Sequence, residues 1–126
     1  ILKVNADEIT ALCGTADVFA AATTCQERYN VEHIAVTDGP GRAFLWSGNR
    51  HWVFDLPALD GLLNPIGAGD TAAAVMLVKY LAGTTIDEAF AQGLAAASAS
   101  CKHLVGAKFS AAELSEMRTE ITVSAS

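Results

Sequence analysis

The sequence has few cations and no long apolar run, and each shortage excludes a class of protein. Lys and Arg number 8 against 14 Asp and Glu over 126 residues, which gives a formal net charge of −6. This acidic balance repels polyanions and argues against nucleic-acid binding. No stretch approaches the ~18 consecutive apolar residues that a membrane helix needs, so a membrane partner is not expected.

Cysteine and histidine are also scarce, with three of each. Cys13, Cys25 and Cys101 are widely spaced and include no Cys-x-x-Cys pair. This pattern is typical of reduced or buried thiols and predicts a cytoplasmic protein. The histidines are equally scattered, so a structural metal site built on them is not expected.

Strand and helix signals alternate along the chain and predict one layered α/β domain with a mostly parallel sheet, flanking helices and a β-hairpin. The expected strands cover residues 1–4 and 34–37, the helices 6–12, 17–29, 71–81, 85–103 and 111–120, and the hairpin 43–54. Trp46 and Trp52 are expected in the hairpin core.

The helix at 71–81 is apolar nearly all round, which predicts burial. Thr85 with Glu88 predicts a capping box, as does Ser110 with Glu113, and residues 124–126 are expected to fray.

A glycine-rich turn, Asn64-Pro65-Ile66-Gly67-Ala68-Gly69-Asp70, leads into the apolar helix. Gly67 and Gly69 allow a tight turn and close approach of a ligand to the backbone. The first-turn N–H groups and the helix dipole favour a phosphate or an oxyanion there. Asp70 beside a bound phosphate can take the proton from an attacking hydroxyl. The same residues also fit a plain loop whose acid complements the helix dipole.

This run resembles the second signature of the ribokinase or PfkB family of carbohydrate kinases, Asp-Thr-x-Gly-Ala-Gly-Asp. The resemblance implies a ribokinase-like fold and ATP-dependent phosphorylation of a sugar or sugar-phosphate hydroxyl. It makes Asp70 the general base and the N–H groups of Gly67, Ala68, Gly69 and Asp70 the anion hole. Asn64, a cofactor-binding candidate, replaces the family's aspartate, and this departure bears on cation binding near the turn.

Asn5 and Glu8 follow the first expected strand and admit two interpretations. Asn5 can cap a helix whose Glu8 closes a capping box. The pair also resembles the family's Asn-x-x-Glu motif, which helps to organise magnesium and phosphate. That resemblance implies that Asn5 and Glu8 contribute to a Mg²⁺ site, with metal-bound water.

Thr37-Asp38-Gly39-Pro40-Gly41 follows another expected strand and by itself would be a turn between two strands. It resembles the family's Thr-x-Gly-x-x-Gly loop, which contacts ATP phosphates. The second glycine of this loop, Gly41, comes one position earlier than in the family's motif, so Arg42 stands where the family has glycine. Thr37, Gly39 and Gly41 are therefore the nucleotide-binding candidates.

These motifs follow the family's order from Lys3 to about Gly106. The stretch 97–101 and then Gly106-Ala107 fall where the family places its adenine pocket wall and part of a monovalent-cation loop, but their small side chains favour close helix packing instead. The resemblance implies that residues 1–126 are the C-terminal ATP-binding and catalytic part of a longer kinase, inactive without the N-terminal half that carries most sugar contacts. It implies ATP and Mg²⁺ as cofactors. It leaves open whether the protein also uses K⁺ and whether it forms a homodimer. The Ala-rich helix after the motif is similar to that of the family's hexose-phosphate branch, which includes 1-phosphofructokinase-like kinases. The alternatives are a ribokinase-fold vitamin or nucleoside kinase and a non-catalytic nucleotide-binding or scaffold module.

Overall fold

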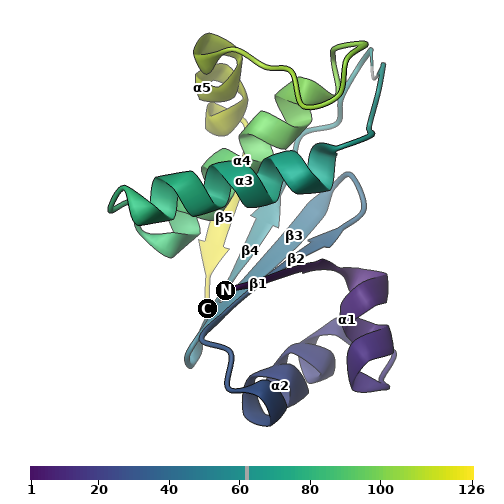
Figure 1. The fold of residues 1–126 in the computed structure, drawn as a ribbon, viewed down its shortest axis with the longest axis vertical. Coiled ribbons are helices and arrows are strands. Elements are labelled where there is room, and N and C mark those ends of the chain that lie inside the picture. Colours follow the sequence, from purple (N-terminus) through teal and green to yellow (C-terminus); the bar gives the residue numbers. More distant parts are fainter. Residues whose placement is uncertain (62) are drawn as a thin grey trace. The chain divides into compact units, whose positions relative to one another are not determined.

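The computed structural model describes residues 1–61 and 63–126. They form two compact units, Ile1–Phe54 with Ser124–Ser126, and Asp55–Val123. Each unit can be followed by colour in Figure 1. Within the described stretches, no helix combines the length and the hydropathy needed to cross a membrane.

The first unit contains a mixed sheet with the strand order β1-β2-β3-β4-β5. The strands are β1 (Leu2–Asn5), β2 (His33–Asp38), β3 (Arg42–Ser47), β4 (Arg50–Asp55) and β5 (Thr122–Ala125). β1 pairs parallel with β2, whereas β2 pairs antiparallel with β3. The expected hairpin is confirmed as β3 and β4 around Gly48-Asn49. The layered α/β class is thus confirmed, and the hairpin makes the sheet mixed rather than mostly parallel.

The end of the chain adds to this sheet, so the prediction of a frayed tail is wrong. The Ser126 N–H donates to the His51 carbonyl at 2.9 Å, and the His51 N–H donates to the Ser126 carbonyl at 3.3 Å. Apart from the half-buried Val123, β5 exposes its side chains. Backbone pairing with a strand far away in sequence therefore holds it, and no local pattern announces such pairing.

Helices α1 (Ala6–Cys13) and α2 (Val18–Tyr29) lie against one face of the sheet (Figure 1). Gly14 ends α1 and Asn30 ends α2, both in the left-handed conformation that glycine and asparagine tolerate best. Trp46 and Trp52 are buried, as expected for the hairpin core. The core between helices and sheet comprises Ile9, Ala21, Ala22, Cys25, Ile34, Val36, Phe44 and Trp46.

The second unit contains α3 (Ala68–Leu81), α4 (Ile86–Ser100) and α5 (Ala111–Thr119). The capping box of Ser110 and Glu113 is confirmed, but Thr85 makes no side-chain cap. Glu88 is used elsewhere, because its two carboxylate oxygens accept hydrogen bonds from Arg118 at 3.0 and 2.7 Å. Hydrogen bonding to Arg118 lowers the pKa of Glu88 and ties α4 to α5.

Gly93 brings α3 and α4 unusually close together. A Cβ atom at this position would collide with the carbonyl oxygen of Ala72 and lie 3.2 Å from the Met76 nitrogen. The alanines and serines of α4 at residues 95–100 are buried. Small side chains therefore allow α3 and α4 to pack closely. This packing holds the first turns of α3 against α4.

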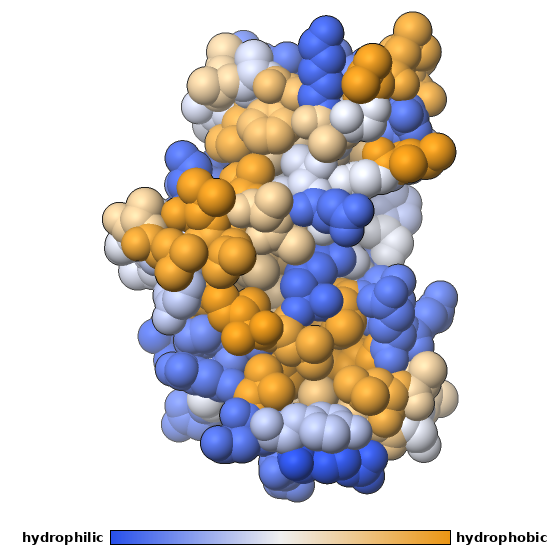
Figure 2. All heavy atoms as spheres, viewed as in Figure 1, coloured by the Kyte–Doolittle hydropathy of each residue, from blue (hydrophilic) through white to orange (hydrophobic). Residues whose placement is uncertain are grey.

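The expectation that α3 is buried holds for only part of its surface. Thr71, Ala72 and Met76 are buried, whereas Val78 is 65% exposed and Leu81 is 76% exposed. Figure 2 shows apolar side chains gathered over the outer side of this helix. An apolar helix without a polar face carries no periodic signal of which face is covered, so the sequence could not reveal this exposed side.

Candidate active site

The backbone at Gly67 starts α3 without a side-chain cap. Gly67 has φ +82° and ψ 0°, a left-handed conformation. The capping residues of α1, α2 and α5 are instead extended, and each accepts a hydrogen bond from a first-turn N–H group through its side chain. The conformation at Gly67 differs from that of ordinary caps, and glycine has no side-chain oxygen. The first turn of α3 is thus left for another acceptor.

Most of the N–H groups predicted to form the anion hole are available. Among residues 1–61 and 63–126, the N–H groups of Gly67, Gly69 and Asp70 have no protein acceptor. The Ala68 N–H differs, since it donates to the Pro65 carbonyl at 3.2 Å. Unpaired N–H groups at a helix start form a site of positive potential, which suits an anion.

Asp70 lies in the first turn of α3 and is exposed to solvent. Within the described part of the chain its carboxylate has no hydrogen bond or ion pair. The turn therefore offers donors for an anion and a free proton acceptor in consecutive residues. That combination suits transfer of a phosphoryl group to a hydroxyl.

The side chain of Asn64 holds the turn in place. Its Oδ1 accepts the Ile66 N–H at 3.0 Å, and its Nδ2 donates to the Leu104 carbonyl at 3.0 Å. The Thr71 hydroxyl and N–H both donate to the Gly67 carbonyl at 2.9 Å. The turn is thus fixed on both sides of its glycines.

In the first unit, the parallel pairing of β1 and β2 brings Asn5 and Thr37 side by side at the carboxyl ends of the strands. The Lys3 ammonium donates to the Thr37 hydroxyl oxygen at 3.2 Å. Thr37 can therefore accept from Lys3 and still donate its own hydrogen to a ligand. The sequence reasoning overlooked Lys3, although a lysine within an apolar strand was a visible signal.

Asn5 and Glu8 form the capping box that was one of their two interpretations. The Glu8 N–H donates to Asn5 Oδ1 at 2.8 Å, and the Asn5 N–H donates to Glu8 Oε2 at 2.8 Å. The described residues contain no group of three His, Cys, Asp or Glu side chains placed to hold a metal. One carboxylate oxygen of Glu8 remains, which fits a magnesium ion that keeps most of its waters.

The turn between β2 and β3 consists of Gly39, Pro40 and Gly41, with Asp38 paired opposite Arg42. Gly39 has φ +67°, so it needs the freedom of glycine, whereas Gly41 has no positive φ. Strand pairing thus continues up to this turn. It presents the backbone of Gly39 at the same sheet end as Thr37.

A separate shallow pocket of about 400 Å³ lies in the first unit, and none of the predicted site residues lines it. It is formed by Asp17, Phe19, Ala20, Thr23, Gln26, Trp46, Gly48, Asn49 and His51. Gly48 and Asn49 are at the opposite end of β3 from the Gly39 turn. The predicted site residues divide between the units, with Asn5, Glu8, Thr37, Gly39 and Gly41 in the first and Asn64 and Gly67–Asp70 in the second.

Comparison with solved structures shows a similar fold in known kinases. The potassium-containing structure of Escherichia coli phosphofructokinase-2 superposes with a TM-score of 0.82 at 22% identity, over 93% of this chain and 39% of that one. Thermotoga maritima ribokinase gives 0.83 at 25% identity, over 94% and 41%. Arabidopsis thaliana ribokinase complexed with ribose and ATP gives 0.82 at 20% identity, over 93% and 40%.

The chain thus spans about two fifths of the length of these kinases. No match was found among curated proteins. The profile described as pfkB family carbohydrate kinase matches residues 1–111, which is most of the chain. On the strength of that match, supported by the fold, this chain belongs to the pfkB family of carbohydrate kinases.

Proposed function

We propose that this chain supplies the phosphate-binding and catalytic part of an ATP-dependent kinase that phosphorylates a sugar or sugar-phosphate hydroxyl. The observation that carries the proposal is the start of α3, where the N–H groups of Gly67, Gly69 and Asp70 are unpaired beside the exposed Asp70 carboxylate. Membership of the pfkB family supports the choice of a carbohydrate as acceptor.

In this mechanism the Asp70 carboxylate accepts the proton of the acceptor hydroxyl as its oxygen attacks the γ-phosphorus of ATP. The bond from that phosphorus to the β,γ-bridging oxygen breaks, and ADP leaves. The unpaired N–H groups of the turn donate to the oxygens of the migrating phosphoryl group, whose charge is greatest in the transition state. Because these donors are fixed beforehand, little reorganisation is needed during the reaction.

The loop after β2 is assigned to the nucleotide. The Thr37 hydroxyl can donate to a phosphate oxygen while it accepts from Lys3. The backbone of Gly39 and Gly41 leaves room for a phosphate chain, because no atom lies within 4 Å of a Cβ added at either position. Glu8 would hold magnesium through water, and when bound that ion would neutralise phosphate charge.

The test is Asp70→Asn in the intact kinase. Loss of a general base should lower kcat by about 10²- to 10⁴-fold, while nucleotide affinity stays largely unchanged. Asp60→Asn is the matched control, since it removes another exposed carboxylate, which lies on a loop and has no part in the mechanism. Near-normal turnover of Asp70→Asn would remove Asp70 from the catalytic role.

A substrate panel on the same protein tests the acceptor. Turnover of sugars or sugar phosphates with no turnover of vitamin alcohols or nucleosides is expected. An ATP titration with and without magnesium distinguishes a kinase from a scaffold, because the scaffold would bind ATP independently of the metal or not at all.

A further inference from the structure

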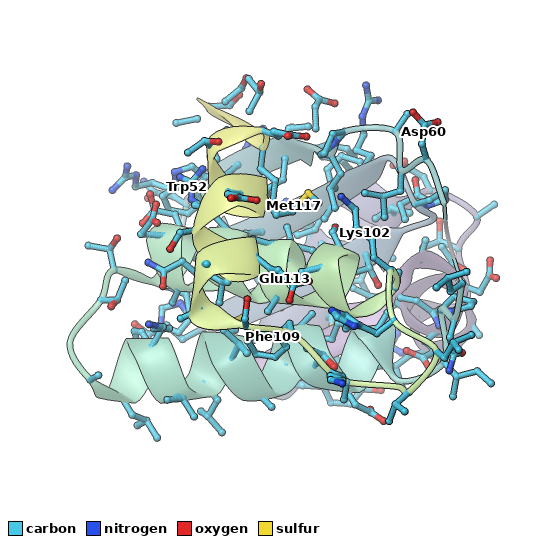
Figure 3. All side chains as sticks on the ribbon, turned by 90° about the horizontal axis from the view of Figure 1, so that it is seen from above. Trp52, Asp60, Lys102, Phe109, Glu113 and Met117 are labelled. Carbon is cyan, nitrogen blue, oxygen red and sulfur yellow. The ribbon has the colours of Figure 1, made fainter. Side chains whose placement is uncertain are left out.

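Asn64 joins the glycine-rich turn to the loop that follows α4. Its Nδ2 donates to the carbonyl of Leu104, 40 residues later in the chain, at 3.0 Å. Its backbone N–H donates to the Cys101 carbonyl at 3.1 Å. Lys102 and Phe109 mark the two ends of this loop in Figure 3. The side chain of Asn64 is therefore one of the ties that hold the loop against the turn.

The orientation of the Asn64 amide is fixed by its partners. Oδ1 accepts the Ile66 N–H at 3.0 Å, and Nδ2 faces the Leu104 carbonyl oxygen. If the amide were flipped, its NH₂ group would face an N–H donor and its oxygen would face a carbonyl oxygen. Both contacts would then be repulsive. A donor N–H beside the Leu104 carbonyl is the arrangement that satisfies every group.

The surrounding backbone leaves little space between turn and loop. A Cβ atom on Gly106 would lie 2.9 Å from the Ile66 carbonyl oxygen and 4.0 Å from Asn64 Nδ2. Ala107 adopts φ +59°, and its nitrogen would lie 3.8 Å from a Cβ on Gly67. The loop therefore follows the turn closely, with the Asn64 amide between them.

The Asn64 amide does not suit a monovalent cation at the Leu104 carbonyl, whereas the structure of E. coli phosphofructokinase-2 contains potassium. A cation needs oxygen ligands. Here the side-chain oxygen of Asn64 faces the Ile66 N–H, and the group that faces the Leu104 carbonyl is a donor, which repels a cation. A cation at the Leu104 carbonyl would meet the amide hydrogens. An aspartate at this position would place a charged oxygen against that carbonyl, and a cation between them would relieve the repulsion.

We propose that the Asn64 amide N–H takes the place of a monovalent cation, linking the glycine-rich turn to the loop after α4, so that this protein needs no potassium. This inference rests on the proposed function, because the turn that Asn64 holds is the one assigned to phosphate binding. The link itself is structural. It can therefore be measured without turnover.

The test compares thermal unfolding of the intact protein in potassium chloride and in tetramethylammonium chloride at equal ionic strength. The melting temperature of the wild type should be the same in both salts. Asn64→Asp should melt about 2–4 °C lower in tetramethylammonium, with that loss restored by potassium. Asn64→Ala should be destabilised equally in both salts, because it offers neither donor nor charge.

Asn49→Asp is the matched control, since it introduces the same charge at an exposed turn and should show no potassium-specific shift. A wild type specifically stabilised by potassium would overturn the proposal, and so would an Asn64→Asp variant that responds equally to both salts. Inactivity of the wild type together with the expected melting behaviour would instead count against the kinase assignment alone. The two proposals can thus fail separately.

Discussion

The contact between Gly93 and the backbone of α3 leads to a prediction whose size can be worked out. In Gly93→Ala the added methyl carbon would collide with the Ala72 carbonyl oxygen and lie 3.2 Å from the Met76 nitrogen. An α-helix pairs these two backbone groups with each other, so no side-chain rotation relieves the collision. Overpacking costs about 1–3 kcal/mol, and alanine in place of glycine in a helix recovers about 1 kcal/mol. Because the obstacle is backbone, the upper cost applies, and the free energy of unfolding should fall by about 2 kcal/mol.

The assay is urea denaturation of the intact protein followed by circular dichroism. Gly41→Ala is the control, because it adds the same methyl group at a position without positive φ and with no atom within 4 Å. Its effect should stay within about 0.5 kcal/mol. If Gly93→Ala were as stable as the wild type, the two helices could not be as close as described. Since Ala72 lies two residues after Asp70, the displacement of α3 should also lower kcat.

Substitutions at three further positions test the glycine-rich turn, the second unit and the first unit. Gly67→Ala should cost about 1–2 kcal/mol in unfolding free energy through its left-handed backbone, with no steric clash, and a smaller loss measured by urea titration would contradict that conformation. Arg118→Leu should cost up to about 1 kcal/mol at neutral pH. Because Arg118 lowers the folded-state pKa of Glu88, the part of this difference that comes from the ion pair should be lost as pH falls through that pKa, as pH-dependent melting would show. If Asn5 acts as a helix cap, Asn5→Ala should lower the free energy of unfolding by about 1 kcal/mol and Asn5→Ser by much less. Urea titrations would measure both.

Local signals in the sequence were enough to place most element ends. Gly14 and Asn30 end helices because they tolerate the left-handed conformation, and Gly48-Asn49 turns the hairpin. The N-cap at Ser110 was equally visible, since its partner Glu113 is three residues away. These features depend on neighbours in the chain, so a single sequence contains them.

Contacts between distant residues could not be predicted in this way. Thr85 has the spacing of a capping box, yet Glu88 pairs with Arg118, 30 residues on. The bond from Lys3 to Thr37 depends on the register of two parallel strands. The motif placed Asp70 at a helix start, but it could not show that the Ala68 N–H is already paired while its neighbours are free.

The uncapped first turn of α3 makes the stability of this protein sensitive to dissolved oxyanions. Sulfate or phosphate in a buffer would act as a removable cap on the free N–H groups, and each would raise the melting temperature as its concentration increases. The choice of buffer is consequently an experimental variable, and comparisons between variants should be made in chloride.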